Sequence, residues 1–257
     1  MYSDWQRIVA VLYEGQGDLT LFQQLAESLD IQFITSAELA ENKEQQFFLS
    51  WREGCLSLLD KDSIKNRGLY VDIGHRQGEQ RTWPIAKGGA LAQALGRKTK
   101  TVVDATAGWG QDSLAMFRMG YEVICVERSP VMAKLLADGL NRLAGLDWMQ
   151  QLNLEPPKLL TGNAVEILEQ LTDQPDCVYL DPMFPAKRKK SALAKKSIMV
   201  LRDLVGDDAD KEQLFAAALK VTGKRVVVKS PDYAEPLGGK PSESFQGKLL
   251  RYDVYLK

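Results

Sequence analysis

Apolar and polar positions alternate most clearly in residues 101–128, TVVDATAGWGQDSLAMFRMGYEVICVER. A short apolar run ends in Asp104, a glycine-bearing turn leads into an amphipathic stretch, and a second apolar run ends in Glu127. Short apolar runs are typical of buried strands, and the 3.6-residue period between them is typical of a helix that covers a sheet. The pattern therefore predicts a βαβ unit of a doubly wound α/β sheet.

Residues with special backbone or charge properties stand at the ends of these two strands. Gly108 and Gly110 let the backbone of the turn approach a ligand closely, because glycine carries no side chain. Two strands in succession end in an acid, and Glu127 stands where such sheets place an acid against ribose hydroxyls. The unit predicts a site for a cofactor that contains a nucleoside.

Two classes of cofactor fit this arrangement. A dinucleotide such as NAD requires the pattern G-x-G-x-x-G, which places a pyrophosphate on the helix N-terminus. Here the turn reads ATAGWGQD, and Asp112 in the first helical turn would repel a pyrophosphate. S-adenosylmethionine has a cationic centre and no phosphate. The acids therefore favour it, although this unit alone leaves NAD open.

The rest of the pattern extends the same architecture. We expect residues 1–75 to form a small α/β subdomain and residues 76–257 to form the main domain. In the subdomain the pattern predicts a helix at 18–30 with Asp18 as N-cap and strands at 7–13, 31–35, 47–51, 55–59 and 69–73. In the main domain it predicts helices at 90–95, 111–119, 130–145, 164–171, 198–205 and 211–219, and strands at 102–104, 123–126, 158–160, 177–180, 225–228 and 248–256, the last one half exposed.

Asn163 and Ala164 follow the third strand of the main domain. In a doubly wound sheet the tip of this strand faces the cofactor base, so Asn163 is a candidate hydrogen-bond partner of adenine. Asparagine is also a common N-cap, and a helix is predicted to begin at Ala164. The sequence leaves both roles open.

The fourth core strand runs directly into Asp181-Pro182-Met183-Phe184-Pro185. Pro182 cannot continue a strand ladder, so it fixes a turn that exposes the Asp181 carboxylate and its own carbonyl. Two such acceptors would polarise an amine on an aromatic ring and direct its lone pair at an electrophile, while Phe184 stacks on the ring. The stretch predicts a site for an amino group attached to a planar base.

A basic segment lies immediately after this motif. Residues 186–196 contain no acid and six cations, Lys187, Arg188, Lys189, Lys190, Lys195 and Lys196. Because the segment adjoins the substrate motif, we interpret it as a phosphate-binding segment and not only as a solvated face.

Composition limits the classes of partner and of site. The 257 residues include 33 basic and 34 acidic ones, so no overall positive field draws the protein to nucleic acid. Three distant cysteines and a single histidine, His75, predict neither a disulfide framework nor a bound metal. The chain shows no signal peptide and no apolar run long enough to span a membrane. We therefore expect a cytoplasmic protein with no metal and no membrane partner.

Four stretches together carry a family resemblance: DATAGWGQDS, ERSP, DPMFPAKRKKSALAKK and VVVKSP. DPMFP is similar to the [D/N]-P-P-[F/Y] motif of methyltransferases that act on adenine N6, guanine N2 or glutamine N5. With Met183 in place of the second proline it resembles the bacterial 16S ribosomal RNA guanine-N2 methyltransferases of the RsmJ type. The resemblance covers some two thirds of the chain, from about residue 81.

The resemblance implies a mostly parallel, seven-stranded class I methyltransferase sheet that is Rossmann-like and ends in an antiparallel hairpin. It also implies that S-adenosylmethionine lies among Gln111, Asp112, Glu127, Arg128, Asn163, Ala164 and Asp181. To these we add Asp104, Gly108 and Gly110 from the pattern of the turn.

The resulting hypothesis is a methyl transfer from S-adenosylmethionine to the exocyclic N2 of a guanine in 16S ribosomal RNA. The RNA is expected either free or in the small ribosomal subunit. Asp181, Pro182 and Phe184 would act on the guanine, which would leave its stack to reach them. Two alternatives stay open. One is an adenine-N6 or glutamine-N5 methyltransferase, and the other is an RNA-binding assembly factor without turnover.

Overall fold

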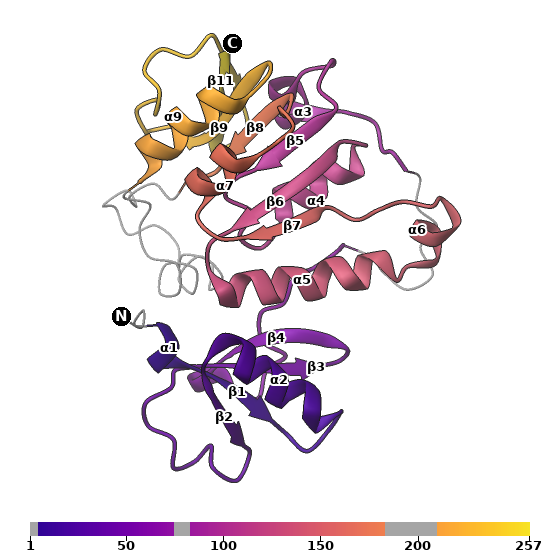
Figure 1. Ribbon diagram of the computed structural model, residues 1–257, viewed down its shortest axis with the longest axis vertical. Coiled ribbons are helices and arrows are strands. Elements are labelled where there is room, and N and C mark those ends of the chain that lie inside the picture. The colour runs from indigo at the N-terminus through magenta and orange to yellow at the C-terminus, as the bar shows by residue number, and fades with distance from the viewer. Residues whose placement is uncertain (1–4, 75–82, 183–209) are drawn as a thin grey trace.

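A computed structural model describes residues 5–74, 83–182 and 210–257. The predicted domain boundary between residues 75 and 76, His75, Phe184, the basic segment and the predicted helix 198–205 lie outside these ranges. Two sheets make up the described fold, and one long helix lies between them (Figure 1).

The N-terminal sheet has four strands in the order β2-β1-β3-β4. Its strands are β1 (Val9–Tyr13), β2 (Gln32–Thr35), β3 (Phe47–Arg52) and β4 (Cys55–Asp60). The short helix α1 (Trp5–Ile8) precedes β1, α2 (Leu19–Leu29) connects β1 to β2, and a 3₁₀ helix, η1 (Lys61–Ser63), follows β4. Asp18 caps α2 as predicted, because its side chain accepts the backbone N–H of Thr20.

The second sheet has seven strands in the order β10-β11-β9-β8-β5-β6-β7. They are β5 (Thr101–Asp104), β6 (Glu122–Glu127), β7 (Lys158–Thr161), β8 (Cys177–Leu180), β9 (Arg225–Pro231), β10 (Glu243–Gln246) and β11 (Leu250–Leu256). Strands β5 to β9 run parallel, and β11 pairs antiparallel with both β9 and β10. The predicted doubly wound, mostly parallel sheet with a terminal hairpin is confirmed.

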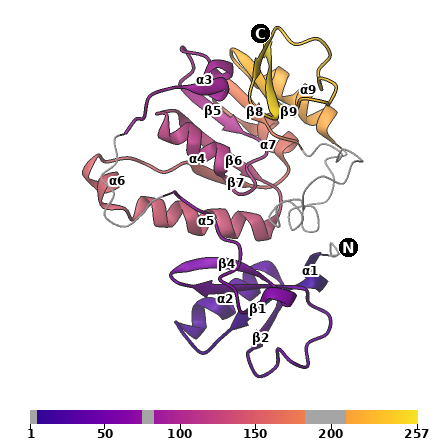
Figure 2. The same ribbon diagram turned by 180° about the vertical axis from the view of Figure 1, so that it is seen from behind.

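Helices cover both faces of the seven-stranded sheet (Figures 1 and 2). One apolar cluster joins the sheet to α3 (Gly89–Leu95), α4 (Gln111–Arg118) and α5 (Pro130–Ala144). A second cluster joins the opposite face to α7 (Ala164–Gln170) and α9 (Lys211–Val221). Burial on both faces explains why the central strands are almost wholly apolar. Within the described residues, no helix is both long and apolar enough to span a bilayer.

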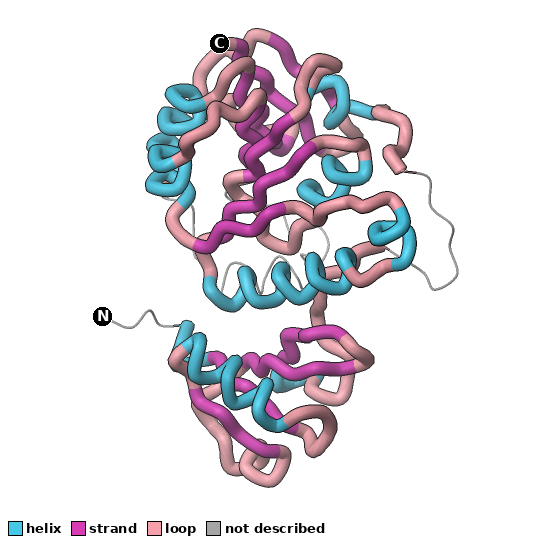
Figure 3. The backbone as a smooth tube through the Cα atoms, turned by 45° about the vertical axis from the view of Figure 1, so that its right-hand side comes forward, coloured by secondary structure: helices cyan, strands magenta, loops and turns pink. Residues whose placement is uncertain are grey.

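Helix α5 lies between the two sheets and fixes them to each other (Figure 3). Gly139 of this helix permits close contact, since a Cβ there would lie 2.4 Å from Cγ1 of Val71. Arg142 donates to the Val71 carbonyl at 2.7 Å, and Arg118 of α4 donates to the carbonyl of Gly74 at 2.8 Å. Apolar packing and these backbone contacts hold the N-terminal sheet against the main one.

The predicted strand at 69–73 is wrong. Leu69 forms only an isolated bridge with Leu58, and the chain then leaves the sheet. The carbonyl of Val71 is bound by Arg142, and the Asp72 carboxylate accepts the backbone N–H of Gly74. These contacts direct the segment toward α4 and α5. Its apolar residues therefore pack between the two sheets and do not add a strand to the N-terminal sheet.

The prediction that the last strand is half exposed is also wrong. Strand β11 lies inside the sheet, and residues 251–255 are buried. Its two charged residues, Arg251 and Asp253, form a buried ion pair at 2.9 Å, and Arg251 also donates to three backbone carbonyls. The polar residues alternate in this strand because Arg251 and Asp253 form a buried ion pair, and not because one face of the strand is exposed to solvent. Helix α6 (Asp147–Gln151) was not predicted.

The strand order places the predicted site residues together. The chain proceeds outward in one direction through β5, β6 and β7 and in the other through β8 and β9. Ligands of such sheets bind where this order reverses, outside the carboxyl ends of the strands. That point is the crevice between the ends of β5 and β8.

Candidate active site

The turn after β5 is built around the Asp104 carboxylate, which is only 1% exposed. It accepts the Ser113 hydroxyl at 2.5 Å and the backbone N–H of Thr106 at 3.2 Å. Both glycines of the turn have positive φ, 51° at Gly108 and 71° at Gly110. A Cβ at Gly110 would lie 2.5 Å from Cδ1 of Leu136, whereas the nearest atom to a Cβ at Gly108 would be the Thr106 carbonyl oxygen at 4.0 Å. Gly110 therefore serves packing, and Gly108 leaves room for a ligand.

Glu127 links this turn to the end of β6. Its carboxylate accepts the backbone N–H of Gly108 at 2.8 Å and that of Ser129 at 2.7 Å. The side chain is buried, and the next residues begin α5 with Ser129 as its N-cap. The two bonds fix the direction of the carboxylate. This geometry suits an acid that holds the hydroxyls of a ribose.

A lysine joins two of the predicted acids. Nζ of Lys229, on β9, lies 2.8 Å from Oδ2 of Asp112 on α4 and 2.8 Å from Oδ2 of Asp181 after β8. The Tyr179 hydroxyl donates to the same oxygen of Asp112 at 2.6 Å. A predicted cofactor residue and a predicted substrate residue therefore share one cation.

The motif after β8 is fixed to the cofactor turn. The backbone N–H of Asp181 donates to Oγ1 of Thr106 at 2.6 Å, and the N–H of Ala105 donates to the Tyr179 carbonyl at 3.0 Å. Pro182 is buried, and the Asp181 side chain is 39% exposed. The carboxylate is thus held at the crevice with a face open to solvent.

The site contains more acids than bases, and this changes their ionisation. Burial raises the pKa of Asp104 to about 7, and the nearby charges of Asp112 and Asp181 act in the same direction. Burial also raises the pKa of Tyr179 well above its usual value, so the phenol stays neutral and a donor. Burial lowers the pKa of Lys229, but Asp181 and Asp112 outweigh it and hold that pKa above its usual value.

The remaining predicted cofactor residues lie along the same edge. Asn163 caps α7, because its side chain accepts the backbone N–H of Val165 at 2.9 Å, and Ala164 is the first residue of that helix. The N-cap role is confirmed, and the adenine contact stays a prediction. Gln111 is exposed at the start of α4, and Arg128 lies 3.4 Å from Asp210 before α9.

Sequence reasoning missed Lys229 as a site residue. The pattern predicted this strand only over residues 225–228, whereas β9 continues to Pro231 and includes Lys229. The sequence signal that could have identified Lys229 is its position on the predicted strand that follows the Asp181 motif. Phe184 and the six cations of the basic segment lie outside the described residues.

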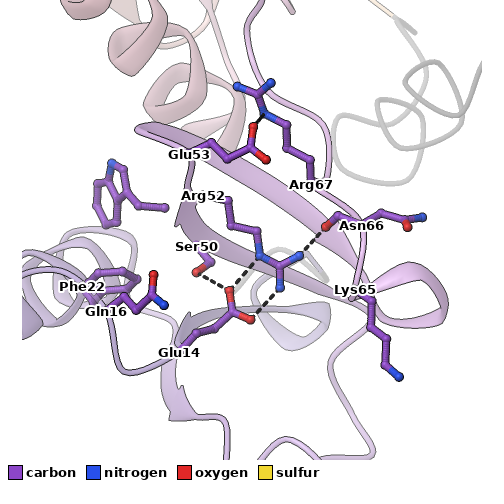
Figure 4. Close-up of a pocket in the computed structure, with 10 residues that line it drawn as sticks. Glu14, Gln16, Phe22, Ser50, Arg52, Glu53, Lys65, Asn66 and Arg67 are labelled. Atoms are coloured by element: carbon purple, nitrogen blue, oxygen red, sulfur yellow. Dashed lines mark hydrogen bonds and ion pairs between the residues drawn. The ribbon is translucent and has the colours of Figure 1, made fainter.

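A separate pocket of about 550 Å³ lies beside the N-terminal sheet (Figure 4). Arg52 spans its floor with an ion pair to Glu14 at 2.6 Å and hydrogen bonds to the carbonyls of Ile64 and Asn66. At the rim, Arg67 pairs with Glu53 at 3.1 Å. Both arginines of the pocket thus bind its own acids, and no predicted site residue reaches it.

Two predicted absences concern metals and disulfides. Cys55, Cys125 and Cys177 are all buried and free. In the ranges that the structure covers, no three His, Cys, Asp or Glu side chains group as metal ligands would.

An open, mostly parallel sheet with acids at successive strand tips is typical of class I SAM-dependent methyltransferases, and comparisons with known proteins show this class. The profile of the family described as "Putative SAM-dependent methyltransferase" matches residues 32–257. A crystal structure of a SAM-dependent methyltransferase from Neisseria gonorrhoeae is similar, with a TM-score of 0.63, 26% identity and 96% of each chain covered.

Curated relatives define the family more closely. "Ribosomal RNA small subunit methyltransferase J" of Shewanella amazonensis is 44% identical, over 86% of this chain and 90% of the relative. The protein of the same name from Tolumonas auensis is also 44% identical, over 86% of this chain and 92% of the relative. The chain belongs to the family of Ribosomal RNA small subunit methyltransferase J. It is an enzyme, and its cofactor is S-adenosylmethionine.

The described residues fit this cofactor. Asp104, Glu127 and Asp181 stand at strand tips and Asp112 in the first turn of α4, so these acids favour a cation and disfavour the pyrophosphate of a dinucleotide. Gly108 has no atom closer than 4.0 Å to the position of a Cβ, and its N–H is held by the Glu127 carboxylate. The choice of S-adenosylmethionine over NAD is thereby supported by geometry as well as by the family.

Proposed function

We propose that this enzyme methylates the exocyclic N2 of a guanine in 16S ribosomal RNA. The observation that carries the proposal is the Asp181 carboxylate, which follows β8 directly and is tied to the cofactor turn through Thr106. An acid at this point, followed by Pro182, supplies acceptors for an amine beside the methyl donor. The names of the relatives support ribosomal RNA of the small subunit as the substrate.

Glu127 and the backbone of Gly108 hold the nucleoside end of the cofactor in this account. Asp104 and Asp112 stand near its cationic part, and Asn163 stands at the strand tip that faces adenine. When bound, S-adenosylmethionine supplies an electrophilic methyl; the amine nitrogen bonds to that carbon as the carbon–sulfur bond breaks, the electron pair stays on sulfur, and the amine proton leaves to water.

Asp181 accepts from the target amine and aligns its lone pair with the methyl group. The Pro182 carbonyl is the second acceptor, and Phe184 stacks on the flipped guanine. Since the amine becomes acidic as it is methylated, the site needs alignment and polarisation and no strong base. Lys229 stays protonated beside Asp181, so it does not take the amine proton.

The RNA backbone would be bound by Lys187, Arg188, Lys189, Lys190, Lys195 and Lys196. These six cations follow the Asp181 motif in a chain whose net charge is −1, so positive charge is concentrated in the sequence directly after the motif proposed to bind the target base. The substrate is 16S ribosomal RNA or the small subunit, and we place the reaction in the cytoplasm, where ribosomes are assembled.

The test is transfer of a tritiated methyl group from S-adenosylmethionine to defined substrates. We expect label in 16S ribosomal RNA or small subunits, recovered as N2-methylguanosine after nuclease digestion. Label as N6-methyladenosine, or in a protein glutamine, would support the alternative targets. Cells that lack the protein should lack one N2-methylguanosine in 16S ribosomal RNA by mass spectrometry, and an unchanged set of methylguanosines would contradict the proposal.

A further inference from the structure

Lys229 joins the two halves of the active site through one ammonium group. Its Nζ lies 2.8 Å from Asp112, at the start of the cofactor helix, and 2.8 Å from Asp181, the proposed amine acceptor. The lysine side chain is 22% exposed and Asp112 is 23% exposed, so solvent screens the first pair little. The contact connects α4, the end of β8 and β9.

A second lysine, next to the start of the same strand, shows what an ordinary structural ion pair looks like here. Lys224, just before β9, lies 2.7 Å from the single acid Asp176 at the opposite edge of the sheet. It is 42% exposed and far along the strand from the crevice. Lys229 differs because it contacts two acids from separate segments, and both segments are part of the site.

The ammonium is required because the acids around it repel one another. Asp112 from α4, Asp181 after β8 and Asp104 at the end of β5 all lie within electrostatic reach, as do the phenols of Tyr179 on β8 and Tyr252 on β11. Two carboxylates that share a site without a cation raise each other's pKa, which favours protonation of one of them. One of them takes up a proton, and a protonated acid presents a donor where an acceptor is needed.

We propose that Lys229 is a positioning residue of the methyl transfer, whose ammonium holds Asp112 and Asp181 as ionised acceptors in one fixed geometry. The inference rests on the proposed function, since it takes Asp181 as the acceptor of the target amine. Lys229 acts through the two acids and touches neither the methyl group nor the amine.

The physical consequence is a loss of alignment when the ammonium is removed. Lys229→Met keeps much of the side-chain volume and leaves Asp112 and Asp181 to repel each other or to share a proton. Displacement of a reacting group by about 1 Å can lower a rate roughly 10²-fold. The loss should depend on pH, because ionisation of both acids restores the acceptors as pH rises. Lys229→Arg keeps the charge and should retain part of the rate.

The test compares single-turnover methylation of 16S ribosomal RNA at saturating cofactor and RNA for wild type, Lys229→Met, Lys229→Arg and the matched control Lys224→Met. We expect a fall of about 10²-fold for Lys229→Met that lessens as pH rises through the neutral range. We expect a smaller fall for Lys229→Arg and an unchanged rate for Lys224→Met. In Lys229→Met/Asp112→Asn the repulsion is gone, so the double variant should be faster than Lys229→Met.

Three outcomes would overturn the inference. They are a wild-type rate in folded Lys229→Met, a loss that is the same at every pH, or a double variant that is no faster than Lys229→Met. If Lys229→Met does not fold, the double variant is compared with Asp112→Asn alone. The repulsion is absent from both, so their rates should be similar, and a double variant that is slower by about 10²-fold would overturn the inference. Wild type that is inactive on 16S ribosomal RNA would instead contradict the proposed function, so the two failures are distinguishable.

Discussion

The carboxylate of Glu127 accepts the backbone N–H of Gly108 at 2.8 Å. This bond crosses from the end of β6 to the glycine turn after β5, and the other carboxylate oxygen accepts the N–H of Ser129 at 2.7 Å. Glu127 therefore shapes the cofactor turn before any ligand arrives. Glu127, which we propose binds the ribose, therefore also forms part of the wall of the site.

Glu127→Gln should weaken S-adenosylmethionine binding about tenfold. Glutamine keeps the shape and one acceptor oxygen but loses the charge that strengthens bonds to the ribose hydroxyls, and charge-assisted bonds are roughly twice as strong as neutral ones. Isothermal calorimetry measures the change. Glu122→Gln, at the exposed start of the same strand, is the matched control and should bind the cofactor as wild type does. Equal affinity of the two variants would remove Glu127 from the site.

Neutralising Lys189, Lys190 and Lys195 should weaken RNA binding and reduce its dependence on salt. Each phosphate contact that is lost should lower the log–log salt slope by roughly 0.7–0.9, because fewer counterions are released on binding. Affinity for S-adenosylmethionine should not change. Filter binding across a series of salt concentrations measures the slope.

The control for this triple variant replaces three exposed lysines at the opposite edge of the sheet, Lys98, Lys100 and Lys220. It removes the same charge from the protein as a whole, so it separates a local contact from a general field. If both triple variants reduce the slope equally, the basic segment has no special role in binding.

Asp104 makes the stability of the enzyme depend on pH. Burial raises the pKa of its carboxyl to about 7 in the folded state, above the usual value of 3.8. Between these two values the folded state holds a proton that the unfolded state has released, so this group's contribution to stability falls as pH rises and levels off above 7.

Asp104→Asn removes this titration while keeping the side chain's shape. The melting temperature of the variant relative to wild type should therefore rise from pH 5 to pH 8, by a few degrees, since about 1 kcal/mol shifts it by roughly 2–4 °C in a chain of this size. Differential scanning calorimetry of both proteins in the same buffers measures the difference. A difference that is constant with pH would mean that Asp104 is ionised throughout this range.

The main sheet could be predicted from the sequence because its signals are local. An apolar run that ends in an acid, a turn with Gly108 and Gly110, and an amphipathic helix that ends before Gly120 together determine β5, α4 and β6. Since the strands are parallel, residues at their carboxyl ends meet at one edge without further information. The grouping of Asp104, Glu127 and Asp181 follows from that rule.

The missed features depend on contacts between distant segments. Lys229 becomes a site residue only because β9 pairs with β8 and brings its ammonium to Asp112 and Asp181. Arg251 and Asp253 look solvent-facing in the sequence and are buried as a pair. The local sequence pattern does not show which residue a charged side chain pairs with. It also does not show whether an apolar segment, such as the one at 69–73, adds a strand to a sheet or packs between two sheets.

The most direct test of the account is the single-turnover rate of methyl transfer to 16S ribosomal RNA for variants of Asp181. The acceptor role requires its contact with the amine to strengthen as positive charge develops on nitrogen, so the barrier depends on it more than RNA binding does. The control is Asp173→Ala, which replaces an exposed acid shortly before the start of β8, the strand that Asp181 follows.

With cofactor and RNA both saturating, we expect Asp181→Ala to be slower than wild type by ~10²-fold or more, the scale of one preorganised electrostatic group. Asp181→Asn, whose carbonyl still accepts, should retain part of the rate, and Asp173→Ala should match wild type. RNA affinity should be nearly the same in all four proteins. Turnover of Asp181→Ala at the wild-type rate would contradict the role of Asp181 as the acceptor of the target amine.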